Sequence, residues 1–153
     1  MSDCVPYAIH IATGEEMAVV MSLAQQRGWD SEKGMNGIAA WYMLRDMGFQ
    51  ITPMKRPEDR VTLKRFLPTL DASKTYIISV THHWFTVRDG IRFDKARTHP
   101  RTEVAAYIEV QRPADQMDAC YEALAEGACA YRRSFGAGDV LIEHVHAEVE
   151  SAQ

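Results

Sequence analysis

The sequence predicts an α+β fold in which an N-terminal helical part packs on an antiparallel sheet. Apolar residues recur at helical spacing through the first part of the 153-residue chain. Near Thr75 the pattern changes to short runs rich in β-branched and aromatic residues, which are typical of strands. Asp89 and Gly90 then form a strong signal for a two-residue hairpin turn between two of these runs.

The helical part is expected to begin with a short helix between Asp3, which can cap its start, and Gly14, which can end it. The further elements expected before the sheet are helices over about 15–26 and 36–46, a strand over 49–54 and a small helix capped by Asp59 or Thr62. The strands of the sheet are expected at 75–81, 83–88, 91–94 and 102–110. Their order along the chain predicts an antiparallel meander.

Residues 113–153 are expected to form a C-terminal helical extension to a first domain of residues 1–112. Its helices are expected over 116–131 and 139–149. Two arrangements stay open for this extension. It packs on the same domain and completes the core, or it projects as an interface for a second copy or a protein partner.

Composition and charge restrict the classes of function. A hydrophobic fraction of 46% and a charged fraction of 25% are ordinary for a globular domain. The net charge of −4 argues against a nucleic-acid partner. Because the chain has neither a membrane-spanning apolar run nor a secretory signal, we expect a cytoplasmic protein with no membrane partner. The three cysteines, Cys4, Cys120 and Cys129, form no CxxC pair, and we expect neither a metal nor a cofactor.

Cys4 is the first candidate for chemistry, because it stands at the predicted N-terminus of the first helix. Backbone N–H groups without intrahelical partners and the positive end of the helix dipole both favour a thiolate there. The same N–H groups can donate to an oxyanion. The alternative is that Cys4 is a small buried hydrophobic residue, as most cysteines without a disulfide are.

The hairpin signal selects one of the six histidines as a partner for this cysteine. With a two-residue turn at Asp89 and Gly90, side-chain alternation puts His83 and Asp94 on one face of the sheet, as diagonal neighbours. His82 then points to the other face. A carboxylate behind an imidazole fixes its tautomer, which a Cys-His-Asp site requires. A three-residue turn would reverse the parity, and both side chains would then be ordinary polar positions.

Together these features resemble the papain-like cysteine peptidases, and more narrowly the small papain-like-fold proteins of phages and bacteria. Those proteins begin with a motif similar to Asp-Cys-Val-x-x-Ala-x-x-x-Ala-Thr-Gly, and this chain has Asp3, Cys4, Val5, Ala8, Ala12, Thr13 and Gly14. They continue with a strand, a His and a strand that ends Asp-Gly-x-x-x-Asp, which here correspond to 75–81, His83 and 89–94. The resemblance covers about residues 3–110.

The resemblance implies a papain-like fold, with Cys4 as nucleophile, His83 as general base and Asp94 as orienting acid. It also implies a protein or peptide substrate and the cytoplasm of a bacterium, including one infected by a phage. Papain-like enzymes usually place a Gln shortly before the nucleophile as an oxyanion donor. Only Met1, Ser2 and Asp3 precede Cys4 here, so the resemblance does not supply that donor.

Three hypotheses for the function follow. The leading one is a cysteine hydrolase of the peptidase, isopeptidase or amidase type. The second is a catalytically inactive papain-like module that binds a protein partner through the tail. The third is a metal site built from Cys4, Asp94 and either His82 or His83, which is the weakest because no two ligands show close metal-type spacing.

Overall fold

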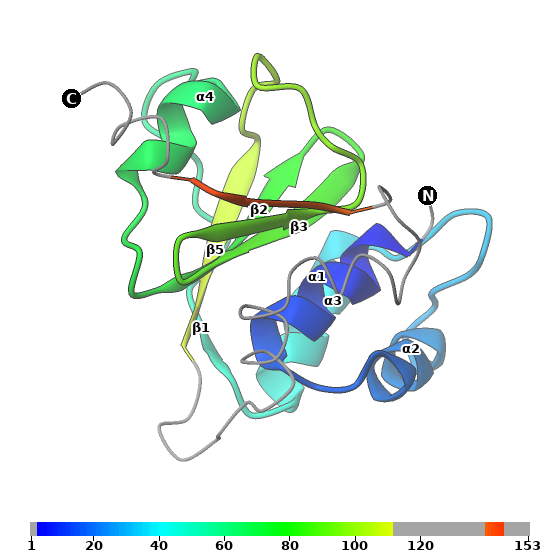
Figure 1. Cartoon of the computed structure of the whole chain (residues 1–153). Coiled ribbons are helices and arrows are strands. Elements are labelled where there is room, and N and C mark those ends of the chain that lie inside the picture. The colour runs from blue at the N-terminus through cyan, green and yellow to red at the C-terminus, as the bar shows by residue number, and fades with distance from the viewer. Residues whose placement is uncertain (1–2, 112–139, 146–153) are drawn as a thin grey trace.

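A six-stranded antiparallel sheet organises the protein, with the strand order β1-β5-β2-β3-β4-β6. The computed structural model describes residues 3–111 and 140–145 (Figure 1). The strands are β1 (Gln50–Ile51), β2 (Thr75–Val80), β3 (His83–Arg88), β4 (Ile91–Asp94), β5 (Ala106–Gln111) and β6 (Leu141–His144). The predicted α+β class is confirmed, and the strands predicted around Asp89 and Gly90 are those observed.

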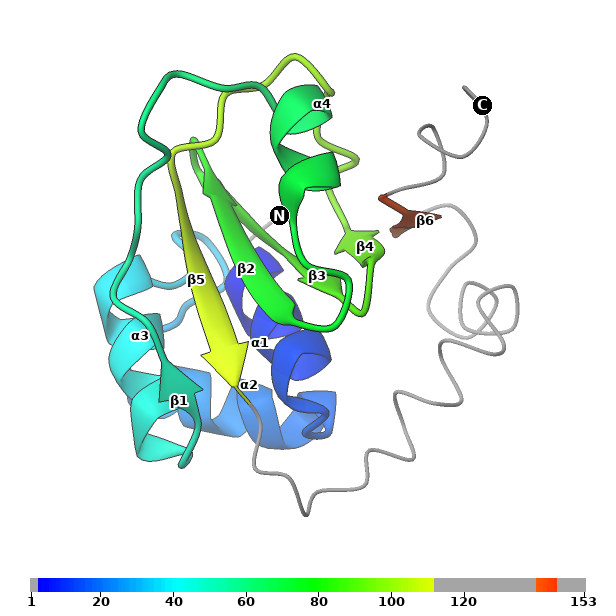
Figure 2. The same ribbon diagram turned by 90° about the vertical axis from the view of Figure 1, so that its left-hand side faces the viewer.

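Helices cover both faces of this sheet, and each face has its own apolar core. On one face lie α1 (Cys4–Thr13), α2 (Met17–Gln26) and α3 (Gly37–Asp46), and on the other lies α4 (Leu63–Phe66), extended by a 3-10 turn (Leu67–Thr69) (Figure 2). The side chains of β2 point alternately to the two faces of the sheet. Ile77 packs in the core beneath α1–α3, and the next residue, Ile78, packs in the core beneath α4. No helix within residues 3–111 and 140–145 has the length and apolar character that a membrane crossing requires.

The strand predicted over 102–110 begins later than expected, at Ala106. The residues before it pair with the segment that leads into α4, through a bridge between Thr62 and Glu103 and a hydrogen bond from Val104 N to Val61 O (3.0 Å). Backbone pairing with a different partner therefore shortens β5. Alternation alone does not distinguish the two partners.

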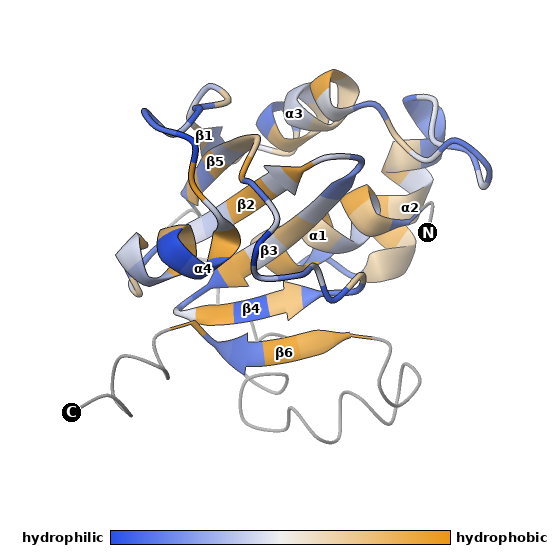
Figure 3. Cartoon of the chain, turned by 90° about the horizontal axis from the view of Figure 1, so that it is seen from above, coloured by the Kyte–Doolittle hydropathy of each residue, from blue (hydrophilic) through white to orange (hydrophobic). Residues whose placement is uncertain are grey.

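The predicted helix over 139–149 is wrong for residues 141–144, which form strand β6 at the edge of the sheet. This strand lies beside β4 (Figure 3) and pairs with it, with Leu141 opposite Asp94 and His144 opposite Ile91. It satisfies backbone groups that β4 would otherwise expose, and Ile142 packs against the cluster around Phe93. This part of the predicted extension is thus a strand of the main sheet, and the helix predicted over 116–131 lies outside the described residues.

Two buried polar side chains of β3 fasten α1 to the sheet. Thr86 Oγ1 donates to the carbonyl oxygen of Ala8 (2.6 Å), and Arg88 Nη1 donates to that of Ile11 (2.7 Å). Both side chains are completely buried. Because these bonds join α1 directly to β3, they fix the position of Cys4, the first residue of α1, relative to His83, the first residue of β3.

We expect Thr86→Val to lower the free energy of unfolding by about 1 kcal/mol, because the bond to α1 is lost inside the core. Urea unfolding measures the change. Thr69→Val is the matched control, since Thr69 Oγ1 bonds only within its own turn, to Phe66 O (2.6 Å), and is partly exposed. An equal loss in both variants would contradict a special role for the bond between β3 and α1.

Candidate active site

Cys4 is the first residue of α1, and its side chain is buried, with 7% of the residue exposed. The expectation that Asp3 caps this helix is wrong, because its carboxylate makes no capping bond and instead pairs with Lys95 Nζ (2.5 Å). The backbone N–H of Val5 instead acts on the thiol and lowers the pKa of Cys4. The start of α1 therefore presents its N–H groups to the thiol rather than to a carboxylate.

The hairpin between β3 and β4 has the two-residue turn that the sequence predicted, with Arg88 opposite Ile91. His83 and Asp94 consequently lie on one face, and His83 Nε2 bonds Asp94 Oδ1 at 2.6 Å. His82 lies in the preceding turn with a positive φ of 59° and is exposed. The predicted contact between His83 and Asp94, and the exclusion of His82 from it, are both confirmed.

The structure also brings Cys4 to this pair, since the Cys4 thiol and the His83 ring line the same pocket and each shifts the pKa of the other. His83 opens β3 at the end of the sheet where α1 begins, so its ring reaches the helix that packs on the opposite face. Because Nε2 is engaged by Asp94, Nδ1 is the ring nitrogen left for the thiol. His83 thus lies between the thiol of Cys4 and the carboxylate of Asp94.

The environment of these three side chains favours a thiolate beside an imidazolium. Burial alone would raise the pKa of Cys4, but the bond to His83 and the N–H groups of Trp84 and Val5 outweigh it and lower that pKa. Burial alone would lower the pKa of His83, but its bonds to Asp94 and Cys4 raise it to about 9. The lowered pKa of Cys4 and the raised pKa of His83 both favour the thiolate–imidazolium form over the neutral pair.

Asp94 is completely buried, and its carboxylate accepts four hydrogen bonds. Oδ1 accepts from His83 and from the N–H of Ala96 (2.9 Å), and Oδ2 accepts from Arg92 Nη2 (2.7 Å) and the N–H of Thr98 (2.8 Å). Burial alone would raise the pKa of Asp94, but the bonds to His83 and Arg92 hold it far below its usual range. The carboxylate therefore stays charged and fixed in orientation.

Sequence reasoning missed Arg92 and the backbone donors of Ala96 and Thr98. The signal for the donors was present, because an Asp at a strand end often bonds the N–H two residues later. Arg92 lies two residues before Asp94 on the same face of β4, so the alternation that paired His83 with Asp94 also selects Arg92. No pattern in the sequence indicated that its side chain turns toward Asp94 rather than toward solvent.

A pocket of about 440 Å³ opens beside the thiol and the imidazole. Trp84, Met35, Ile38 and Met54 supply apolar wall, and Ile38 is 66% exposed. Asn36 also lines the pocket and caps α3 by accepting from the N–H of Ile38 (2.7 Å). A group that enters this pocket reaches the nucleophile from the side of α3.

The chemical assignment of this site depends on the side chains described above. Within residues 3–111 and 140–145, no group of three or more His, Cys, Asp or Glu side chains is arranged to hold a metal ion. Asp94 already uses both oxygens on His83, Arg92 and backbone donors. No family model, curated protein or solved structure matches this chain.

Proposed function

We propose that the protein is a cysteine hydrolase that cleaves an amide bond, as a peptidase, isopeptidase or amidase of the papain-like type. Cys4 is its nucleophile, His83 its general acid and base, and Asp94 the residue that orients His83. The observation that carries the proposal is the hydrogen bond between His83 and the buried Asp94, with Cys4 beside His83 at the wall of a pocket. A protein or peptide is the substrate class we propose.

The geometry supports a two-stage reaction. The Cys4 thiolate attacks the carbonyl carbon, and the N–H groups at the start of α1 are donors for the oxyanion. His83 gives its proton to the leaving nitrogen as the C–N bond breaks, which leaves a thioester on Cys4. His83 then takes a proton from water, the hydroxide attacks the thioester, and the acid product departs while the thiolate and imidazolium are restored.

Alkylation by iodoacetamide tests the nucleophile without knowledge of the substrate. We expect Cys4 to react at pH 6 at least roughly tenfold faster than a free model thiol, because its pKa lies below the ordinary value. Mass spectrometry of the modified peptides separates Cys4 from Cys120 and Cys129, which serve as thiols of the same chain. Cys4 that reacts no faster than the model thiol would favour a non-catalytic module instead.

Hydrolysis of a peptide or amide library is expected to follow a bell-shaped pH profile. Activity rises as Cys4 becomes a thiolate and falls as the pH passes about 9, where His83 loses the proton that the leaving amine needs. Profiles of kcat/KM measure both limbs. Activity that keeps rising beyond pH 9 would contradict the role of His83 as the acid.

A further inference from the structure

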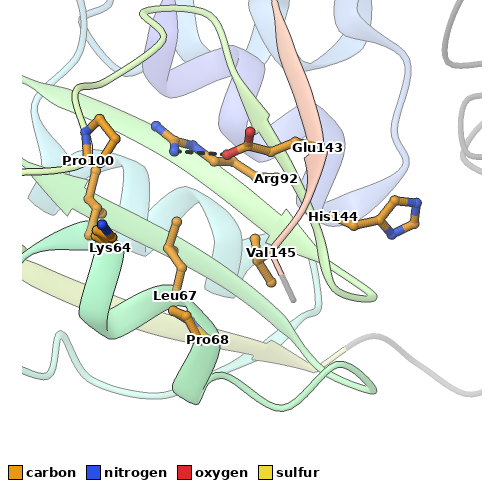
Figure 4. A pocket seen from close by; sticks show the side chains of 9 residues that line it. Lys64, Leu67, Pro68, Arg92, Pro100, Glu143, His144 and Val145 are labelled. Atoms are coloured by element: carbon orange, nitrogen blue, oxygen red, sulfur yellow. Dashed lines mark hydrogen bonds and ion pairs between the residues drawn. The ribbon is translucent and has the colours of Figure 1, made fainter. Parts of the chain in front are cut away.

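Arg92 joins the candidate site to the C-terminal strand. It is buried, with 3% exposed, and its Nη2 group donates to Asp94 Oδ2 (2.7 Å) and to Thr98 O (2.8 Å). Its Nη1 group donates to Oε1 of Glu143 on β6 (3.2 Å) (Figure 4). One guanidinium therefore bridges two carboxylates that come from different strands, and only the first of them belongs to the site.

A second line of contacts joins Arg92 to His83. The guanidinium lies over the ring of Phe85, 4.9 Å from its centroid. Phe85 is completely buried, and its ring stacks with that of His83 at a centroid distance of 6.0 Å and an angle of 27°. Arg92 thus contacts both Asp94, which bonds His83, and Phe85, whose ring stacks with that of His83.

The two carboxylates on Arg92 differ in their access to water. Asp94 is completely buried, whereas the Glu143 side chain is 47% exposed. The bond to Glu143 lies at a pocket of about 210 Å³ between α4 and β6, on the face of the sheet opposite α1–α3 (Figure 4). Glu143 reaches Arg92 only because β6 is paired with β4, where Arg92 stands opposite Glu143.

We propose that Arg92 is a positioning residue of the site, and that the ion pair with Glu143 modulates the interaction of Arg92 with Asp94. The pairing of β6 with β4 thereby regulates the reactivity of His83. This inference rests on the proposed function for its catalytic consequence. The electrostatic effect that it predicts is a change in the titration midpoint of His83, which can be measured without turnover.

The sign of each effect follows from the charges around His83. These are Cys4 on α1, Asp94 and Arg92 on β4, Glu143 on β6 behind Arg92, the Asp3–Lys95 pair beside α1, and His82 in the turn. Arg92 offsets the negative charge of Asp94, so its removal stabilises the imidazolium. Glu143 offsets part of the charge of Arg92, so its removal has the opposite effect.

NMR titration of the His83 ring in the full-length protein tests this directly. We expect Arg92→Met to raise the His83 titration midpoint by about one pH unit, and Glu143→Gln to lower it by about a few tenths of a unit. Arg92→Lys keeps the charge but cannot bridge both carboxylates. It is expected to titrate close to the wild type, while kcat falls roughly tenfold and KM changes little.

Arg60→Met is the matched control, because Arg60 also bridges to a carboxylate of another segment, Glu103 (2.9 Å), but far from the site and exposed. It is expected to change neither the midpoint nor kcat. Unchanged midpoints in both Arg92→Met and Glu143→Gln, or shifts of the same sign, would overturn the inference. Where Arg92→Met does not fold, the exposed position of Glu143 keeps Glu143→Gln available as the deciding variant.

The two proposals fail in different ways. Wild-type protein that hydrolyses no amide, yet shows opposite midpoint shifts in the two variants, would contradict the proposed function and leave the electrostatic role of Arg92 intact. Wild-type protein that hydrolyses amides, with midpoints insensitive to Arg92 and Glu143, would support the hydrolase and overturn the positioning role.

Discussion

Cys4→Ala and His83→Ala are each expected to reduce amide hydrolysis by at least about a thousandfold while the protein stays folded. In the proposed reaction, Cys4 supplies the electron pair that attacks the carbonyl, and His83 supplies the proton for the leaving nitrogen. The two effects are not additive, so the double variant is expected to resemble either single one. Initial rates and circular dichroism of the same samples measure activity and fold.

His82→Ala is the control for this experiment, because it removes the adjacent imidazole, which lies in an exposed turn. We expect it to leave kcat/KM close to that of the wild type. An equal loss of activity from both histidine variants would contradict the assignment of His83, since a nonspecific effect on the turn or the pocket would then explain both.

Asp94→Ala is expected to lower the free energy of unfolding by about 3–5 kcal/mol, which is a large part of the stability of a small domain. The substitution removes the charge that Arg92 faces and leaves the N–H groups of Ala96 and Thr98 without their acceptor. Because the orienting acid is often the least costly member of a triad to lose, Asp94→Ala is expected to reduce hydrolysis less than Cys4→Ala or His83→Ala does. The buried contacts of Asp94 predict in addition that this substitution affects folding most of the three.

Urea unfolding measures this loss, and Asp46→Ala is the matched control. Asp46 also pairs with an arginine, Arg27 (2.8 Å), but the Asp46 side chain is 46% exposed and that of Arg27 is 34% exposed, so a much smaller loss is expected. Because folding lowers the pKa of Asp94, its contribution is present above pH about 4 and is lost as the pH falls further. The difference between Asp94→Ala and wild type should therefore shrink in acid, and a constant difference would contradict the assignment.

The contact between His83 and Asp94 could be predicted because it depends on a short loop. Asp89 and Gly90 fix a two-residue turn, and side-chain alternation then determines which residues share a face. Cys4 at the start of a helix was predictable for the same reason, since the apolar spacing and Gly14 are local signals. That Cys4 meets His83 followed only from the resemblance, because no local rule places a helix terminus beside a strand end.

The errors all involve partners distant in the chain. Leu141 and Val145 are four residues apart, as on a helix, but the unpaired edge of β4 determines the conformation of that segment. Asp3 is of a residue type that often caps a helix, but its carboxylate pairs with Lys95 instead. Arg92 looks like an ordinary polar residue of a strand until Asp94 and Glu143 are both in place around it.

The pairing of β6 with β4 has a consequence for the growing chain on the ribosome. Residues 141–144 are translated after every other described strand, so β4 emerges with one edge unpaired. At about 5–20 residues per second this edge stays open for seconds, during which it can pair with another nascent chain. The last of the described strands to be synthesised therefore both covers the edge of β4 and brings Arg92 together with Glu143.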